Sequence, residues 1–162
     1  WSSDVCSSDL LYMAGQLHDI GKIGIEDRVL TAPRRLKDDE WAQIREHPAT
    51  AVAILDPLPR MDAVKQWIYE HHERWNGEGY PRGLKGQEIS LPGRILILVE
   101  VFDALNTRRS YKDAWSREEI LDYYRRERGR HFDPDLCDLL VEGLSREGSA
   151  FLGARAQQGL FS

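Results

Sequence analysis

The stretch HHERWNGEGYP at residues 71–81 sets two adjacent histidines directly before a glycine-rich loop. Ahead of the pair, apolar side chains recur at steps of three and four residues, which predicts a helix over 62–75. Residues 76–87 then contain four glycines and a proline, and this composition predicts a loop. Neighbouring side chains on a helix diverge by about 100°, so His71 and His72 are expected to reach two different metal ions.

Histidines and carboxylates in other parts of the chain extend this pair into a set of metal-ligand types. A neutral imidazole and a carboxylate are ligands that divalent metals take at neutral pH. An ionised Glu100 on an apolar helix is costly to bury unless it is paired or bound to a metal. A lone histidine is more often an ordinary core or surface residue, but the combination within one short chain indicates a metal centre. Its predicted ligands are His18, Asp19, His47, His71, His72 and Glu100.

Capping signals and apolar periodicity predict helices along most of the remaining chain. Pro48 suits the first turn of a helix, so one helix is expected to end at His47 and another to begin there. Ser116 and Glu119 form a capping box that opens a further helix. The other expected helices cover residues 10–17, 92–105 and 134–144, with a loop at 24–36. We find no internal repeat and few strand signals, so the predicted class is all-α.

Size and charge narrow the class of protein further. A chain of 162 residues suggests one domain with a real core. The net charge of −5 at pH 7 argues against a DNA or RNA partner, because non-specific binding needs a broad basic surface. The sequence has no apolar run long enough for a membrane span and no secretory signal. Cys6 and Cys137 form no disulfide pattern, so we expect a cytoplasmic location.

The first ten residues differ in character from the rest of the chain. Ser2 to Leu10 matches one translated reading frame of a common sequencing adapter, so residues 1–10 are interpreted as a non-native leader. The alternative is a natural segment rich in serine and aspartate. We accordingly expect a domain over 11–145, with one or more N-terminal helices missing, and a C-terminal tail over 146–162.

The most distinctive motifs are HDIGKIGI at 18–25, HHE at 71–73 and GYPRGLKG at 79–86. Together they resemble the HD-GYP family, a branch of the HD-domain metal phosphohydrolases that hydrolyses cyclic di-GMP in bacteria. HDIGK is shared with other HD proteins, whereas the glycine-rich loop after HHE is specific to this branch. The resemblance runs from about Leu11 to about Leu144. It implies an HD-domain helical bundle with a glycine-rich GYP loop.

The resemblance also implies roles for individual residues. It implies two divalent metals, or three in the intact protein, with iron or manganese the usual choice. Asp19 would bridge the metals, and Lys22, one turn further on, would neutralise phosphate charge, so these two are the implied catalytic residues. Asp103 matches a second acid that orients a neighbouring group. The implied substrate-binding residues are Tyr80, Arg109 and Lys112.

The chain departs from the family pattern in three respects. Glu100 stands where the family has aspartate, and its longer side chain is expected to shift the carboxylate within the site. Ala51 and Ser110 stand where the family has glycine and proline, and both changes are expected to be tolerated. The family also carries acid and histidine ligands on a helix that would precede Leu11 here.

Three functions are compatible with these residues. The leading interpretation is an enzyme that uses divalent metals to hydrolyse the phosphodiester bonds of cyclic di-GMP to pGpG, with GMP as a further product. The second is a catalytically impaired receptor for the dinucleotide, or a docking module, which Glu100 favours. The third is an HD phosphohydrolase of another nucleotide, against which the GYP loop speaks. Because such modules are commonly fused to other domains, the expected partner is an N-terminal receiver or sensor domain.

Overall fold

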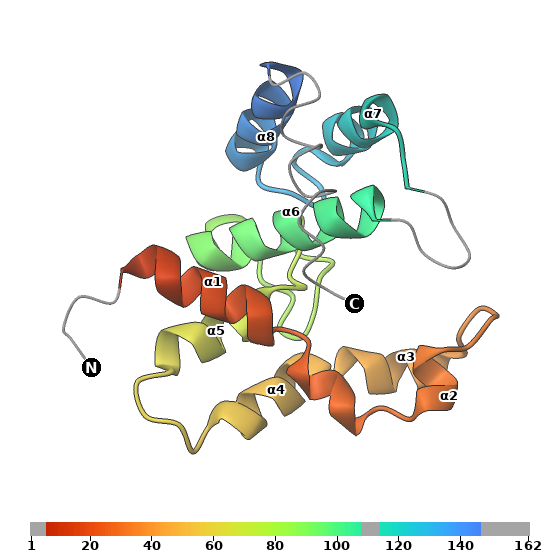
Figure 1. Cartoon of the computed structure of the whole chain (residues 1–162), viewed down its shortest axis with the longest axis vertical. Helices are drawn as coiled ribbons and strands as arrows, with labels where there is room; N and C mark the ends of the chain where they lie inside the picture. The colour runs from red at the N-terminus through yellow and green to blue at the C-terminus, as the bar shows by residue number, and fades with distance from the viewer. Residues whose placement is uncertain (1–5, 108–113, 147–162) are drawn as a thin grey trace, which may run out of the picture.

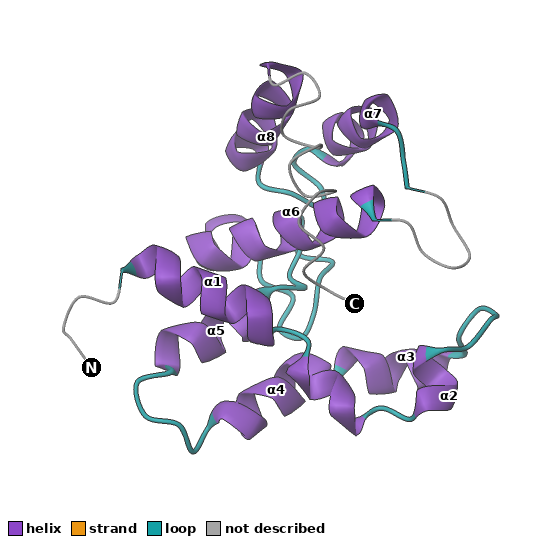
Figure 2. Ribbon diagram, viewed as in Figure 1, coloured by secondary structure: helices purple, strands orange, loops and turns teal. Residues whose placement is uncertain are grey.

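The computed structural model describes residues 6–107 and 114–146, and every named element within these ranges is a helix (Figure 2). The predicted all-α class is therefore confirmed. In chain order the elements are α1 (Ser7–Leu17), the 3-10 helix η1 (Ile20–Gly24), α2 (Asp27–Leu30), α3 (Asp38–Arg45), α4 (His47–Leu55), α5 (Asp62–Glu70), the 3-10 helix η2 (Gly86–Glu88), α6 (Leu91–Asn106), α7 (Arg117–Glu127) and α8 (Pro134–Arg146). None of these helices is long and apolar enough to cross a membrane.

Helix α6 lies at the centre and contributes to two apolar clusters (Figure 1). The cluster on the side of α1, α4 and α5 has as its buried members Ala14, Ala51, Leu55, Val64, Ile68 and Leu96. The cluster on the side of α7 and α8 contains Ile97, Leu98, Ile120, Leu121, Tyr124, Phe132, Cys137 and Leu144. Because consecutive residues of α6 enter different clusters, this one helix joins the two parts of the molecule. Its burial is incomplete, since Val99 remains 52% exposed.

Three predicted boundaries near the histidines and in the first loop are wrong. Helix α5 ends at Glu70 rather than near residue 75, and His71 is its C-cap. The chain turns away there because the Tyr80 N–H donates to the His72 carbonyl at 3.2 Å, which folds the following loop back. His47 is the first residue of α4 instead of the last of the preceding helix. The one-turn helix α2 lies inside the expected loop at 24–36.

The predicted helix starts in the C-terminal part are confirmed. Ser116 Oγ accepts a hydrogen bond from the Glu119 N–H at 3.3 Å, and the Ser116 N–H donates to the Glu119 carboxylate at 2.8 Å. Asp133 precedes α8 and accepts from the Asp135 N–H at 2.8 Å. Such side-chain caps satisfy backbone groups that the first turn of a helix leaves without partners.

The proposed domain limits stay predictions. Residues 7–10 of the expected leader form the first turn of α1, and Leu10 packs against the cluster of α1, α4 and α5. Helix α8 ends at Arg146, so the remainder of the expected tail lies outside the described residues. Arg109, Ser110 and Lys112 also lie outside them.

Candidate metal centre

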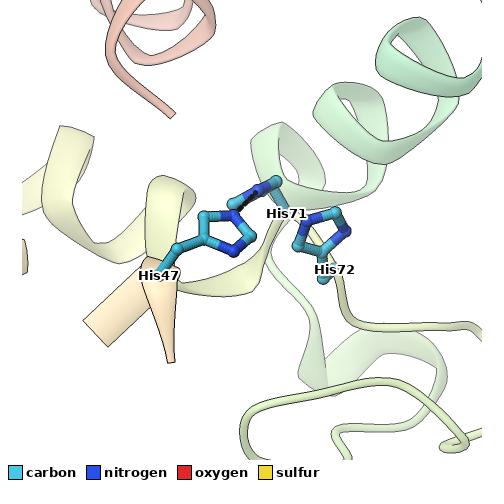
Figure 3. A group of neighbouring side chains, drawn as sticks. All are labelled: His47, His71 and His72. Carbon is cyan, nitrogen blue, oxygen red and sulfur yellow. Dashed lines mark hydrogen bonds between the residues drawn. The ribbon is translucent and has the colours of Figure 1, made fainter. Parts of the chain in front are cut away.

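Three histidines from two separate segments converge on one point. His47 begins α4, whereas His71 and His72 follow the last turn of α5. Their ligand nitrogens all lie within 4.8 Å of one another. Figure 3 shows the His47 ring reaching the His71–His72 pair from the neighbouring helix. His47 and His71 are buried and His72 is partly buried, so the three form an inner cluster, not a surface patch.

The hydrogen bonds of two rings assign their protons. His47 Nδ1 lies 2.7 Å from the Ile44 carbonyl oxygen, and His71 Nδ1 contacts the Ile68 carbonyl oxygen. A carbonyl oxygen can only accept, so each Nδ1 carries a proton and each neutral ring keeps a lone pair on Nε2. These two Nε2 atoms lie only 3.2 Å apart. Neutral rings in these tautomers place no proton between them, and two converging lone pairs fit a metal cation.

Burial keeps these imidazoles in the form that binds metals. It lowers the pKa of His47, lowers that of His71 to about 3, and also lowers that of His72. The rings are therefore neutral near pH 7, as metal ligation requires. The bonds from Nδ1 to backbone carbonyls also hold the ring planes, which is the usual arrangement around a metal-ligating histidine.

Gly21 brings the HD pair against the histidine cluster. A Cβ atom at Gly21 would lie 2.0 Å from the His47 carbonyl oxygen and 2.6 Å from the Ala51 nitrogen. Only glycine therefore allows η1 to rest on the first turn of α4. As a result, Asp19 Oδ1 lies 3.7 Å from His47 Nε2. His18 Nε2 lies 3.6 Å from Asp19 Oδ2.

Asp19 is held as a carboxylate. Burial by itself raises its pKa, but a hydrogen bond from Lys22 and nearby positive charge outweigh this effect, and the pKa is lowered. Lys22 Nζ lies 2.7 Å from the carboxylate oxygens. The Lys22 ammonium thus contacts the Asp19 carboxylate, and its predicted role in neutralising phosphate charge stays a prediction.

Glu100 and Tyr80 approach the cluster from the side of His72. Glu100 Oε2 lies 3.9 Å from His72 Nδ1, so the longer acid reaches the site from α6. The Tyr80 ring is stacked on the His72 ring, with centres 4.7 Å apart. Burial raises the pKa of Tyr80, and Glu100 raises it further, so the phenol stays protonated. All six predicted metal ligands therefore lie around one site. Asp103 is exposed on α6, and its predicted role stays a prediction.

Two buried glutamates that flank the histidine pair anchor the glycine-rich loop. The Glu73 carboxylate accepts hydrogen bonds from the backbone N–H groups of Arg82 at 2.7 Å and Leu84 at 2.9 Å. Glu70 accepts from the Arg82 guanidinium at 2.7 Å and from the Ser90 N–H at 2.9 Å. Sequence reasoning gave these acids no role, although charged residues on both sides of a buried histidine pair were a usable signal.

Gly79 completes the contact between the loop and the histidine segment. A Cβ atom at this position would lie 2.3 Å from the Arg74 nitrogen and 2.5 Å from the Glu73 Cα atom. The first residue of the GYP motif thus packs directly on the backbone that follows the histidine pair. This close approach places the next residue, Tyr80, over His72.

Known proteins resemble this chain in both sequence and fold. A sequence model described as HD domain matches residues 4–136. The chain is 42% identical over 137 residues to the 3′3′-cGAMP-specific phosphodiesterase 2 of Vibrio cholerae, covering 83% of this chain and 26% of the relative. It is 43% identical over 136 residues to the cyclic di-GMP phosphodiesterase response regulator RpfG of Xanthomonas campestris, covering 83% and 36%.

A solved structure shares the fold. It is a crystal structure of a cyclic GMP-AMP-specific phosphodiesterase from Vibrio cholerae, with a TM-score of 0.66 at 24% sequence identity. The match covers 93% of this chain and 40% of that one. The chain spans between about a quarter and about a third of the length of the two curated relatives.

Proposed function

The chain belongs to the HD-domain family, in its HD-GYP branch, and on this premise we propose that it hydrolyses cyclic dinucleotides with bound divalent metals. One observation carries the proposal. The Nε2 lone pairs of His47 and His71 face each other at 3.2 Å, with the Asp19 carboxylate beside them. Donors of these types at this spacing suit a divalent cation and serve no other evident purpose in the fold.

Each proposed metal ligand contributes from a fixed backbone position. Asp19 would offer two carboxylate oxygens to the cations, and each imidazole would offer one nitrogen. When bound, divalent metals lower the pKa of water and withdraw charge from a phosphoryl group. The proposed ligands are His18, Asp19, His47, His71, His72 and Glu100, and the proposed metals are two ions of iron or manganese.

Neighbouring side chains act on the phosphate and on the pocket. The Lys22 ammonium neutralises charge on the phosphodiester that is cleaved. Tyr80 walls the pocket beside His72, and its protonated phenol is able to donate a hydrogen bond. Arg109 and Lys112 contact the phosphates of the substrate in this proposal, and Asp103 orients a basic neighbour.

The proposed substrate is cyclic di-GMP, which would be opened to pGpG and then cleaved to GMP. A specific observation also favours 3′3′-cGAMP, because a relative that is 42% identical bears that name. Because Glu100 stands in place of the family's aspartate, the second proposed function is that of a receptor that binds the dinucleotide without cleaving it. We place the protein in the cytoplasm and propose a fused N-terminal receiver or sensor domain, in keeping with the response regulator among its relatives.

Turnover of the two dinucleotides tests this proposal. The chain is purified without oxygen, loaded with Fe²⁺ or Mn²⁺, and incubated with cyclic di-GMP or 3′3′-cGAMP, and the products are separated by chromatography. We expect hydrolysis that Asp19→Ala abolishes and that Arg125→Ala leaves unchanged, because exposed Arg125 pairs with Asp122 on α7. Binding without turnover would identify a receptor, and the absence of both would point to a different nucleotide.

A further inference from the structure

Arg45 lies at the edge of the histidine cluster, although nothing in the sequence motifs marks it. It is the last residue of α3, and its side chain is exposed. Its Cζ atom lies 5.7 Å from the centre of the Tyr80 ring. That ring is stacked on His72, with centres 4.7 Å apart and planes inclined by 29°. The distance from the Arg45 guanidinium to the centre of the His72 ring is therefore at most the sum of these two distances.

Arg45 also differs from Arg28 and Arg34 in its partners. Arg28 is ion-paired with Glu26 at 2.5 Å, and Arg34 is ion-paired with buried Glu40 at 2.6 Å. Within the described part of the chain, the Arg45 side chain makes no ion pair or hydrogen bond, and it lies over the face of the Tyr80 ring. Its positive charge is therefore not neutralised by a neighbouring acid.

The contact with Tyr80 prepares the guanidinium for an anion. A guanidinium that lies on an aromatic face keeps its N–H donors in its own plane, directed away from the ring. Those donors match two oxygens of a phosphate group in a paired arrangement. The tyrosine limits the motion of the side chain, so less conformational freedom is lost when a phosphate binds.

We propose that Arg45, resting on Tyr80, binds the phosphodiester of the cyclic dinucleotide that is not being cleaved. This inference rests on the proposed function. A cyclic dinucleotide carries two phosphodiesters, separated by a ribose on either side of the ring. The metal ligands and Lys22 act on one of them, so the second must lie outside the cluster. Arg45 lies outside it, over the ring of Tyr80, which is itself stacked on His72.

Two substrates that differ in the second phosphodiester test the role of Arg45. Cyclic di-GMP has two such groups, whereas bis(p-nitrophenyl) phosphate has one. We expect Arg45→Ala in the Mn²⁺-loaded chain to raise KM for the cyclic dinucleotide about tenfold, the loss typical of one charge-assisted contact. Hydrolysis of bis(p-nitrophenyl) phosphate stays within twofold of the wild type. The KM of Arg45→Lys for the cyclic dinucleotide should lie between those of the wild type and Arg45→Ala, because lysine keeps the charge but lacks the paired donors.

The control is Arg125→Ala, which removes an exposed arginine of α7 and leaves both substrates unaffected. An equal loss on both substrates would overturn the inference, because Arg45 would then act by holding Tyr80 and His72. An unchanged KM for the dinucleotide would overturn it while leaving the proposed function intact. A wild-type chain that cleaves bis(p-nitrophenyl) phosphate but neither binds nor cleaves either dinucleotide would overturn the proposed function together with this inference.

Discussion

The consecutive residues Glu70, His71, His72 and Glu73 form two pairs with opposite surroundings. The glutamates are 1% and 0% exposed, and their carboxylates accept hydrogen bonds from loop N–H groups and from Arg82. His71 is also 0% exposed, but its Nε2 lone pair faces another acceptor on His47. The protein supplies hydrogen bonds to both glutamates, whereas His71 directs an acceptor toward another acceptor.

This difference separates the groups that hold the fold from the groups that await a ligand. A buried charge that receives several hydrogen bonds fixes the path of the backbone that supplies them. Buried lone pairs that face each other contribute little to the fold without a cation. Substitutions in the two pairs should therefore affect different properties, and two measurements test this expectation.

The largest expected effect is on function, from a change in the histidine pair. His71→Gln removes the Nε2 lone pair that would bind the metal, while it keeps much of the side-chain volume. We expect metal content, measured by mass spectrometry, to fall and hydrolysis to drop roughly a thousandfold or more. Without metal, the free energy of unfolding of this variant should lie within about 1 kcal/mol of the wild-type value. A variant with full metal content would contradict the assignment of His71 as a ligand.

The next effect is on stability, from a change in the glutamate pair. Glu73→Ala leaves the N–H groups of Arg82 and Leu84 without their acceptor, so the free energy of unfolding should fall by about 3 kcal/mol. Urea denaturation of the metal-free chain measures this. Glu78→Ala, at an exposed position in the same loop, serves as the matched control and should change stability by less than about 0.5 kcal/mol. Equal urea midpoints for Glu73→Ala and Glu78→Ala would contradict the role of Glu73 in holding the loop.

The smallest effect concerns His131, a histidine outside the cluster, whose ring is stacked on Phe132 at 4.4 Å. Burial lowers its pKa from 6.5 to about 4. The unfolded chain therefore binds a proton that the folded chain does not, so stability present above pH 6.5 is lost as pH falls toward 4. Relative to His131→Gln, the metal-free wild type should lose about 1 kcal/mol between pH 6.5 and 5. Parallel stability curves for the two proteins would rule this out.

Local chemistry allowed much of the fold, and the residues that gather at the candidate site, to be predicted from the sequence. Ser116 and Asp133 cap their helices through atoms within three residues, so a short window contains the whole interaction. Histidine and carboxylate are side chains able to bind metals, and the six predicted ligands lie around one site, where their role as ligands stays a prediction. Gly21 and Gly79 could be recognised in the sequence as parts of motifs, but the close packing that requires glycine at these positions could not be predicted.

The tertiary structure alone decided how these residues are held. Glu70 and Glu73 bond to groups that lie between nine and twenty residues further along the chain, so their partners depend on the path of the loop. Gly21 is required because η1 rests on α4, and Arg45 gains its place on Tyr80 because the loop folds back over His72. The sequence by itself determined the kinds of donor atoms, because these belong to single residues. Their convergence required packing between distant segments, which no local pattern encodes.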